Sequence, residues 1–330
     1  MLAFTDLREL APLLCQGSVV SWGNFDGVHL GHQALLRAVV SRSRGMQAPA
    51  VVVTFDPHPA VFFNGGGAPH SITDTADKLA LLSRLDVDYT LVLPFTAKFA
   101  KQTPEEFVKN ILADGLKAKA VILGYDVGFG KNRQGGIERL AELGAEHGFS
   151  AEKMPPTLGP SGPYDKADAV PVSSTGVREA IKDGEVDRAA RLLGRVHSVH
   201  SIVEHGAGRG NSLLGFPTAN IDPGTLLLPP HGVYACLVKC EDEFYSAAVN
   251  LGFNPSFNGA RPSLEAHILD FDGNLYGKKI RIYFLRFLRA EKKFGSIQDL
   301  TEQIGLDVEN TARVAAQARQ TANFETLYPL

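Results

Sequence analysis

Short apolar runs alternate with helical patterns along the first half of the chain, and this alternation constrains the fold more than any other feature. The expected strands are Ser18–Gly23, Ala50–Phe55, Asp88–Leu93, Ala120–Gly124 and a weaker run near Phe149–Met154. The amphipathic stretches between them are Gln33–Ser43, Ala76–Arg84, Pro104–Ala113 and Ile137–Glu146. This pattern is typical of a parallel α/β sheet, which binds ligands beyond the carboxyl ends of its strands.

One of these helices carries a clear start signal. Thr103, Pro104, Glu105 and Glu106 match an N-cap residue, a proline at the first helical position and the glutamate of a capping box. We therefore expect a helix to begin at Pro104.

The pattern changes after about residue 190. Short apolar runs separated by Gly, Pro, Asn and Asp favour an antiparallel barrel or sandwich. These runs are Val233–Val238, Tyr245–Asn250, Leu264–Phe271 and Lys279–Phe287. Two helices are expected to follow, at Ser296–Ile304 and Asp307–Ala322. The joint falls in the charged stretch Ile181–Arg191, so we predict two domains, 1–185 and 186–330.

The charge balance argues against several classes of partner. The chain has 33 Lys and Arg against 36 Asp and Glu, a net charge of −3, whereas nucleic-acid and membrane-surface proteins normally carry a basic excess. The first ten residues hold no apolar signal core, and no apolar run approaches the roughly 18 residues of a membrane span. Three scattered cysteines do not make a disulfide framework. We predict a cytoplasmic protein with small-molecule substrates, without nucleic-acid or membrane partners; a homo-oligomer is left open.

The segment Gly23–His32 joins an expected strand to an expected helix, where backbone N–H groups and the helix dipole favour an anion. His29 and His32 share a face at the helix start, and Gly31 leaves room for a close approach. An imidazole pair there can donate to phosphate oxygens and stabilise charge in a transition state. The alternative is a plain turn with two surface histidines. The candidate phosphate contacts of this turn are Gly23, Asn24, Phe25, Asp26 and Gly31, with His29 and His32 as catalytic candidates.

A second candidate anion site is the segment Val172–Arg178. Ser173, Ser174 and Thr175 can cap the helix that follows, and Arg178 lies in its first turn, where the dipole disfavours a cation. A bound phosphate would remove this conflict by pairing with the guanidinium. A capped helix with a solvated arginine is the alternative.

Two further turns end expected strands on the same, ligand-facing side. His58 lies between two prolines after the second strand, and Asp126 follows the fourth. His58 could equally be part of a rigid turn without a ligand.

In the second half, a glycine-rich segment runs from Gly206 to Asn220. Gly208, Arg209 and Gly210 can wrap phosphates, and Thr218 with Asn220 offers two oxygen ligands suited to Mg²⁺. A glycine-rich barrel turn is the alternative.

Glu265 is the carboxylate that stands out in this half. Alternation along Leu264–Phe271 places it on one face with His267, Leu269 and Phe271. Taken alone, this pattern indicates either a carboxylate near the end of the barrel or one that takes part in catalysis.

These segments carry a family resemblance. The turns at Gly23–His32 and Val172–Arg178, with Thr54–Pro59 and Gly124–Gly135, resemble the nucleotidyltransferase superfamily and, within it, the FMN adenylyltransferase module of bacterial bifunctional FAD synthetases. The resemblance covers nearly all of the first 185 residues and implies a Rossmann-like parallel sheet. The residues that it implies at the triphosphate are His29, His32, Ser173, Ser174, Thr175 and Arg178. Those that it implies along the shared nucleotide and flavin site are Asn24, Asp26, His58 and Asp126. Val127 and Gly128 depart from the family, which usually has Phe and a larger residue there.

The second half resembles the riboflavin kinase module of the same enzymes over about residues 187–306. The segments that carry the resemblance are Gly215–Asn220, His231–Ala235, Val249–Gly259 and Leu264–Ser296. The resemblance implies a six-stranded barrel, Mg-ATP at Thr218 and Asn220, and Glu265 as the base facing the flavin. Asn211–Leu214 forms a loop one residue longer than usual and lacks a common basic residue, for which Arg209 is a substitute.

The two implied reactions need different groups. Phosphorylation of riboflavin activates a neutral hydroxyl, for which a positioned carboxylate is useful. Adenylyl transfer to FMN uses a phosphate that is already an anion, so it needs alignment and charge neutralisation. We predict that the chain uses ATP and Mg²⁺ to make FMN from riboflavin and FAD from FMN. The alternatives are a nucleotidyltransferase for another phosphorylated substrate and a non-catalytic flavin sensor.

Overall fold

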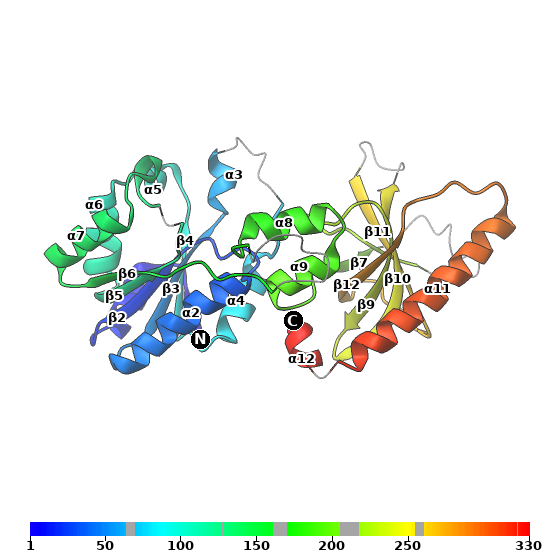
Figure 1. Cartoon of the computed structure of the whole chain (residues 1–330), viewed down its shortest axis with the longest axis horizontal. Helices are drawn as coiled ribbons and strands as arrows, with labels where there is room; N and C mark the ends of the chain where they lie inside the picture. The colour runs from blue at the N-terminus through cyan, green and yellow to red at the C-terminus, as the bar shows by residue number, and fades with distance from the viewer. Residues whose placement is uncertain (64–69, 127, 161–169, 205–217, 255–260, 322) are drawn as a thin grey trace. The chain divides into compact units, whose positions relative to one another are not determined.

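The computed structural model describes residues 1–63, 70–126, 128–160, 170–204, 218–254, 261–321 and 323–330 (Figure 1). The chain divides into two compact units, Met1–Ser174 with Leu330, and Thr175–Pro329. This division falls at the start of α8 (Ser174–Lys182), and the domain boundary at residue 185 stays a prediction.

The first unit is built on a six-stranded parallel sheet of order β1-β4-β3-β2-β5-β6. Its strands are β1 (Leu2–Phe4), β2 (Ser18–Trp22), β3 (Ala50–Asp56), β4 (Tyr89–Pro94), β5 (Ala118–Leu123) and β6 (Ser150–Lys153). The five predicted strands are confirmed, because apolar residues fill the inner strands on both faces. The short edge strand β1 was not predicted, since its three residues are mostly exposed.

Helices cover both faces of this sheet, so the unit has three layers (Figure 1). α2 (Leu30–Gly45) and α4 (Thr75–Ser83) pack on one face through Leu36, Val39 and Leu82. The other face packs against α1 (Leu7–Leu10), α6 (Pro104–Phe107), the π-helical turn η2 (Val108–Ala113) and α7 (Ile137–His147). The shorter helical segments are η1 (Ala11–Leu13), α3 (Pro59–Phe63), α5 (Ala97–Ala100) and η3 (Lys131–Arg133).

The capping box predicted at Thr103 is confirmed. The Thr103 hydroxyl accepts a hydrogen bond from the backbone N–H of Glu106, whose carboxylate accepts one from the N–H of Thr103.

The strand order places a topological switch at the centre of the sheet. From β2 the chain proceeds to β3 and β4 on one side, whereas β5 pairs with the other side of β2. The segments that follow β2 and β5 therefore diverge at the carboxyl edge, where open α/β sheets form their ligand crevice.

The second unit is a closed antiparallel barrel of order β10-β11-β8-β7-β12-β9. Its strands are β7 (Ser198–Glu204), β8 (Ala219–Ile221), β9 (Gly232–Cys240), β10 (Glu243–Asn254), β11 (Arg261–Ile268) and β12 (Lys279–Arg289). The barrel prediction is confirmed, although β7 and β8 were not predicted. β8 has only three residues, and four of the seven residues of β7 are polar.

Helices flank the barrel strands. α9 (Val186–Leu193) follows α8, and α11 (Ile297–Arg319) covers the outer face of β9 and β12 through Val314 and Ala315 (Figure 1). α12 (Phe324–Leu327) comes last. Both stretches predicted to be helical are confirmed, but the break between them was wrong, because α11 continues through Gly305. A glycine inside a helix costs about 1 kcal/mol relative to alanine, which packing against the barrel offsets. Among the described residues, no helix is long and apolar enough to cross a membrane.

Candidate functional site

The turn after β2 is held by two apolar side chains. Phe25 and Val28 are each 1% exposed, although their φ angles of 47° and 40° are uncommon for such residues. Gly27, with φ of 81°, lies between them. Backbone in this region is strained, and such strain persists where the surrounding packing fixes it, often at functional sites.

His29 is the N-cap of α2. Its Nδ1 accepts the backbone N–H of His32 at 3.3 Å, so this nitrogen carries no proton and the ring proton is on Nε2. The two imidazoles are stacked with centroids 3.6 Å apart, and Phe25 meets the His32 ring edge-on. The sequence prediction that His29 and His32 act as a pair at the helix start therefore has matching geometry.

Gly31 allows two backbone segments to approach each other. A Cβ at this position would lie 3.1 Å from both the Val172 carbonyl oxygen and His29 Cε1. Nearby, Ser174 Oγ donates to the carbonyl oxygen of Asp26 at 2.9 Å. The two turns that were predicted as separate anion sites are thus joined, and Arg178 follows Ser174 by one turn of α8.

Asp26 is buried and its carboxylate binds protein backbone. Its oxygens accept the N–H groups of Ile72 at 3.0 Å and Thr73 at 3.1 Å, and the Thr73 hydroxyl accepts the N–H of Gly27 at 3.1 Å. At 2% exposure, this side chain connects the turn after β2 to the start of α4. We interpret Asp26 as a group that shapes the site; its predicted contact with a nucleotide stays a prediction.

His58 and Asn24 lie at the ends of adjacent strands. His58 is half-buried, and its Nδ1 accepts the N–H of Ala60 at 3.1 Å. The carbonyl oxygen of Asn24 accepts the Thr54 hydroxyl at 3.2 Å, which joins the ends of β2 and β3.

The turn after β5 contains the departure from the family noted at Gly128. A Cβ there would lie 2.8 Å from Nε of Arg133, so the guanidinium takes the space that a side chain would fill. Arg133 also donates to the carbonyl oxygen of Asp126 at 2.9 Å. Sequence reasoning missed Arg133, although a glycine in place of a larger residue was the available signal. Val127 lies outside the described residues.

The barrel places polar side chains in one row across its strands. Glu265 on β11 is directly opposite Asn220 on β8 and Asn250 on β10. Directly opposed residues in antiparallel strands have Cβ atoms about 4.5–5.5 Å apart and face the same side. The alternate residues, such as Leu264 and Ala266, belong to the barrel core, so the row lies on the outer face.

Glu265 is half-buried, and this burial raises the pKa of its carboxyl group because the charged form loses hydration. His267 shares its face, as expected. β11 ends at Ile268, so the same alternation does not extend to Leu269 and Phe271. A carboxylate with a raised pKa beside two amide side chains is suited to accept a proton.

Thr218 and Asn220 are both half-exposed; Asn220 lies in β8, and Thr218 comes immediately before this strand. Gly208, Arg209 and Gly210, and the longer loop at 211–214, lie outside the described residues. Sequence reasoning missed Asn250, whose signal is its alternation with buried Val249 and Leu251. It also missed Glu291, whose Oε1 would lie 2.5 Å from a Cβ at Gly252 on the outer face of β10.

Comparisons with known proteins agree with both halves of this geometry. The FAD synthetase family matches residues 13–162, and the riboflavin kinase family matches residues 193–315. The bifunctional riboflavin kinase/FMN adenylyltransferase of Haemophilus influenzae is 35% identical over 300 residues, which are 91% of this chain and 94% of that protein. The chain belongs to this bifunctional family.

Another member of the bifunctional riboflavin kinase/FMN adenylyltransferase family, from Escherichia coli K12, is 35% identical over 93% of this chain and 95% of its own length. Among solved structures, the macrolide-efflux protein from Streptococcus pneumoniae has a TM-score of 0.80 at 30% identity, covering 94% of this chain and 98% of that one. His29, His32 and Asp126 fall within the FAD synthetase match, and Glu265 falls within the riboflavin kinase match. Ser173–Arg178 lies between the two matched segments.

Proposed function

We propose that this bifunctional enzyme uses two separate sites, one at the strand ends of the parallel sheet and one on the outer face of the barrel. The chain phosphorylates riboflavin to FMN with ATP, and it transfers an adenylyl group from ATP to FMN, giving FAD and pyrophosphate. The observation that supports the assignment of the kinase site is the cross-strand row of Asn220, Glu265 and Asn250.

In the kinase reaction, Glu265 is the proposed base. It accepts the proton of the riboflavin hydroxyl as the oxygen attacks the γ-phosphorus of ATP and ADP leaves. A raised pKa suits this role, because the carboxylate then binds the proton more readily in the course of the reaction. Asn220 and Asn250, on either side, would hold the carboxylate and the hydroxyl in place.

In the adenylyl transfer, the phosphate of FMN attacks the α-phosphorus of ATP and pyrophosphate leaves. His29 presents Nε2–H as a donor at the N-terminus of α2, while its Nδ1 is held by the helix backbone. Ser174 would hold phosphates at the start of α8, and the predicted phosphate contact of Arg178, further along this helix, stays a prediction. These groups align and neutralise anions, and no strong base is required.

Thr218 and Asn220 are the proposed Mg²⁺ ligands. Both residues are half-exposed, and an oxygen donor set of one hydroxyl and one amide fits this cation. Magnesium would supply charge neutralisation at the phosphates of ATP.

Two substitutions test the separation of the sites. Glu265→Gln should lower the kcat for FMN formation by about 10²–10⁴-fold, the usual contribution of a general base, while FMN-to-FAD conversion is unchanged. His29→Ala should have the reverse effect. Glu243→Gln in the barrel and His147→Ala in α7, both exposed residues, are the matched controls. A Glu265→Gln enzyme with normal kinase turnover would overturn the base assignment.

Chromatography of products after incubation with riboflavin, ATP and Mg²⁺ distinguishes the alternatives. FMN followed by FAD supports the proposal. A flavin sensor would bind flavin without product, and a nucleotidyltransferase for another substrate would adenylylate a different phosphorylated compound in a substrate panel. A cytoplasmic location, where ATP is available for both reactions, is part of the proposal, and assembly into a homo-oligomer stays a prediction.

A further inference from the structure

Lys78 is a buried lysine that has no assigned role in either of the two reactions. It is 4% exposed and lies on the buried stripe of α4 with Leu81 and Leu82, three and four residues further on. An isolated ammonium group is costly to bury, and burial lowers its pKa, opposed by the carboxylates of Asp26, Asp56 and Asp74.

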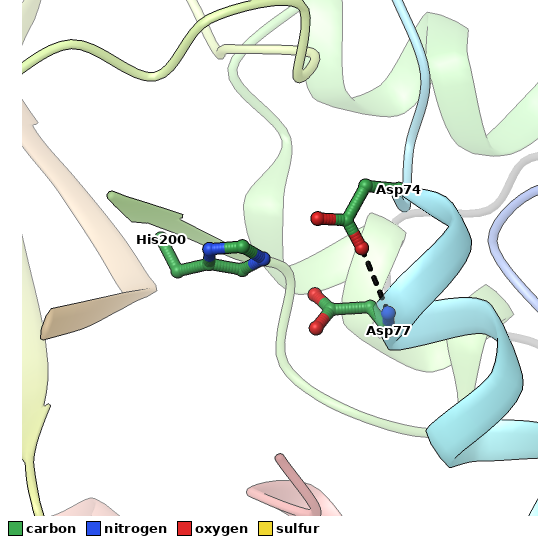
Figure 2. A group of neighbouring side chains, drawn as sticks. All are labelled: Asp74, Asp77 and His200. Carbon is green, nitrogen blue, oxygen red and sulfur yellow. Dashed lines mark hydrogen bonds between the residues drawn. The ribbon is translucent and has the colours of Figure 1, made fainter. Parts of the chain in front are cut away.

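The position of Lys78 is fixed by the helix that carries it. α4 begins after its N-cap Asp74, whose Oδ1 accepts the backbone N–H of Asp77 at 2.7 Å (Figure 2). The segment immediately before this cap, Ile72–Thr73, is hydrogen-bonded to the Asp26 carboxylate. α4 is therefore tied at its start to the turn after β2.

The Lys78 ammonium group begins a short chain of hydrogen bonds. Its Nζ donates to Thr54 Oγ1 at 3.3 Å, and the Thr54 hydroxyl donates to the carbonyl oxygen of Asn24 at 3.2 Å. Thr54 is fully buried in β3, so neither group exchanges this contact for water. Hydrogen bonds in such a chain polarise and strengthen one another.

This chain ends in the turn that leads to His29. Asn24 is followed by the strained residues Phe25 and Val28 and then by the histidine that caps α2. An apolar side chain at residue 78 would fill the space without the cost of burying a charge. The charged group therefore has a use that packing alone does not explain, namely to hold the Asn24 carbonyl through Thr54.

We propose that Lys78 is a positioning residue for adenylyl transfer, which fixes the turn before His29 by holding the Thr54 hydroxyl against the Asn24 carbonyl. The proposal rests on the assignment of adenylyl transfer to the strand-end site. Lys78 acts through Thr54 and does not touch the substrates.

The experiment compares Lys78→Met, Thr54→Val and the double variant in the full-length chain, with exposed Lys98→Met as the control. Thr54→Val keeps the shape of the side chain, and Lys78→Met keeps an unbranched side chain that is one atom shorter. A small misplacement of catalytic groups costs up to about 100-fold in rate, so we expect Lys78→Met to lower the kcat for FMN adenylylation about 10- to 100-fold, with little change in KM. Riboflavin kinase activity of the same chain should be unchanged.

A double-mutant cycle tests the route through Thr54. The double variant should be no slower than the worse of the two single variants, because both remove one chain of contacts. Additive losses, or Lys78→Met at the wild-type rate, would overturn the proposal. So would a loss of both activities in proportion to a lowered thermal midpoint, which indicates a role in folding alone. Thr54→Val provides the test if Lys78→Met folds poorly. If His29→Ala retains adenylyl transfer, the assignment of the site fails, whatever Lys78 does.

Discussion

Burial of the Glu265 carboxylate opposes stability while it favours catalysis. The group is half-buried on the outer face of the barrel, between two asparagines in the cross-strand row. Its pKa is raised because the charged form is poorly hydrated there. The residue proposed as the kinase base is therefore one that the folded state would hold more easily without its charge.

The pH dependence of stability tests this conflict. The folded state binds a proton at Glu265 more readily than the unfolded state, so above the raised pKa the buried carboxylate lowers the free energy of unfolding. Glu265→Gln should raise the thermal midpoint at pH 7, and its advantage should shrink as the pH falls from the raised pKa of Glu265 to the ordinary glutamate range, where the carboxyl group is protonated in both states. Calorimetry of both proteins from pH 4 to 8 measures this difference. An equal midpoint throughout would mean that the burial has no energetic effect.

At single residues, the sequence does not reveal contacts between residues that are far apart along the chain. The predicted ligand contact of Asp26 stays a prediction, and nothing in the sequence indicated that its carboxylate also accepts hydrogen bonds from the backbone of Ile72 and Thr73. Lys78 carried a signal, since it is spaced from Leu81 and Leu82 as a buried helical residue is. That spacing does not reveal the Thr54 hydroxyl, because the two residues meet only in the folded sheet.

At the scale of elements, predictions succeeded where the determinants are local. The capping box at Thr103 involves residues three apart, and continuous apolar runs identified the inner parallel strands. β8 was missed because only three residues pair there, in register with Leu264–Ala266 of a strand more than 40 residues later in the chain. α11 was divided in two because Gly305 weakens helix propensity, whereas contacts with the barrel keep the helix continuous.

Gly31 offers a test in which helix propensity and packing predict opposite effects. Alanine is the better helix former by about 1 kcal/mol, but a Cβ at residue 31 would press on the Val172 carbonyl and the His29 ring. We expect Gly31→Ala to fold with a similar midpoint and to lose roughly tenfold or more in adenylyl transfer, because groups aligned for reaction are displaced.

Gly45→Ala at the end of the same helix is the matched control, since a Cβ there meets nothing within 4 Å. It should leave adenylyl transfer unchanged. If the two variants have equal activity, the close approach of Val172 to α2 is not needed for the reaction.

The whole molecule combines a parallel α/β sheet with an antiparallel barrel. In the sequence, a change in the spacing of apolar residues distinguishes these two folds. The parallel sheet has its own core on both faces, and the barrel has an interior core and an outer one under α11. The change from strand–helix alternation to short strands between turns marks the two folds. It does not locate their boundary, because α8 and α9 run through the joint with only Gly184 between them as a chain-breaking residue.

Each unit has its own core and its own proposed site, and FMN is the product of one reaction and the substrate of the other. We therefore expect FMN to pass between the two sites through solvent. A Glu265→Gln chain keeps adenylyl transfer, and a His29→Ala chain keeps riboflavin phosphorylation, so a mixture should make FAD from riboflavin after a lag in which FMN accumulates. The lag should shorten as the concentration of the Glu265→Gln chain rises, because the second step then meets more enzyme. Chromatography over time follows both products, with each variant alone as the control. In the wild-type enzyme, unlabelled FMN added with labelled riboflavin should dilute the label in FAD; undiluted label would mean that FMN passes between sites without release.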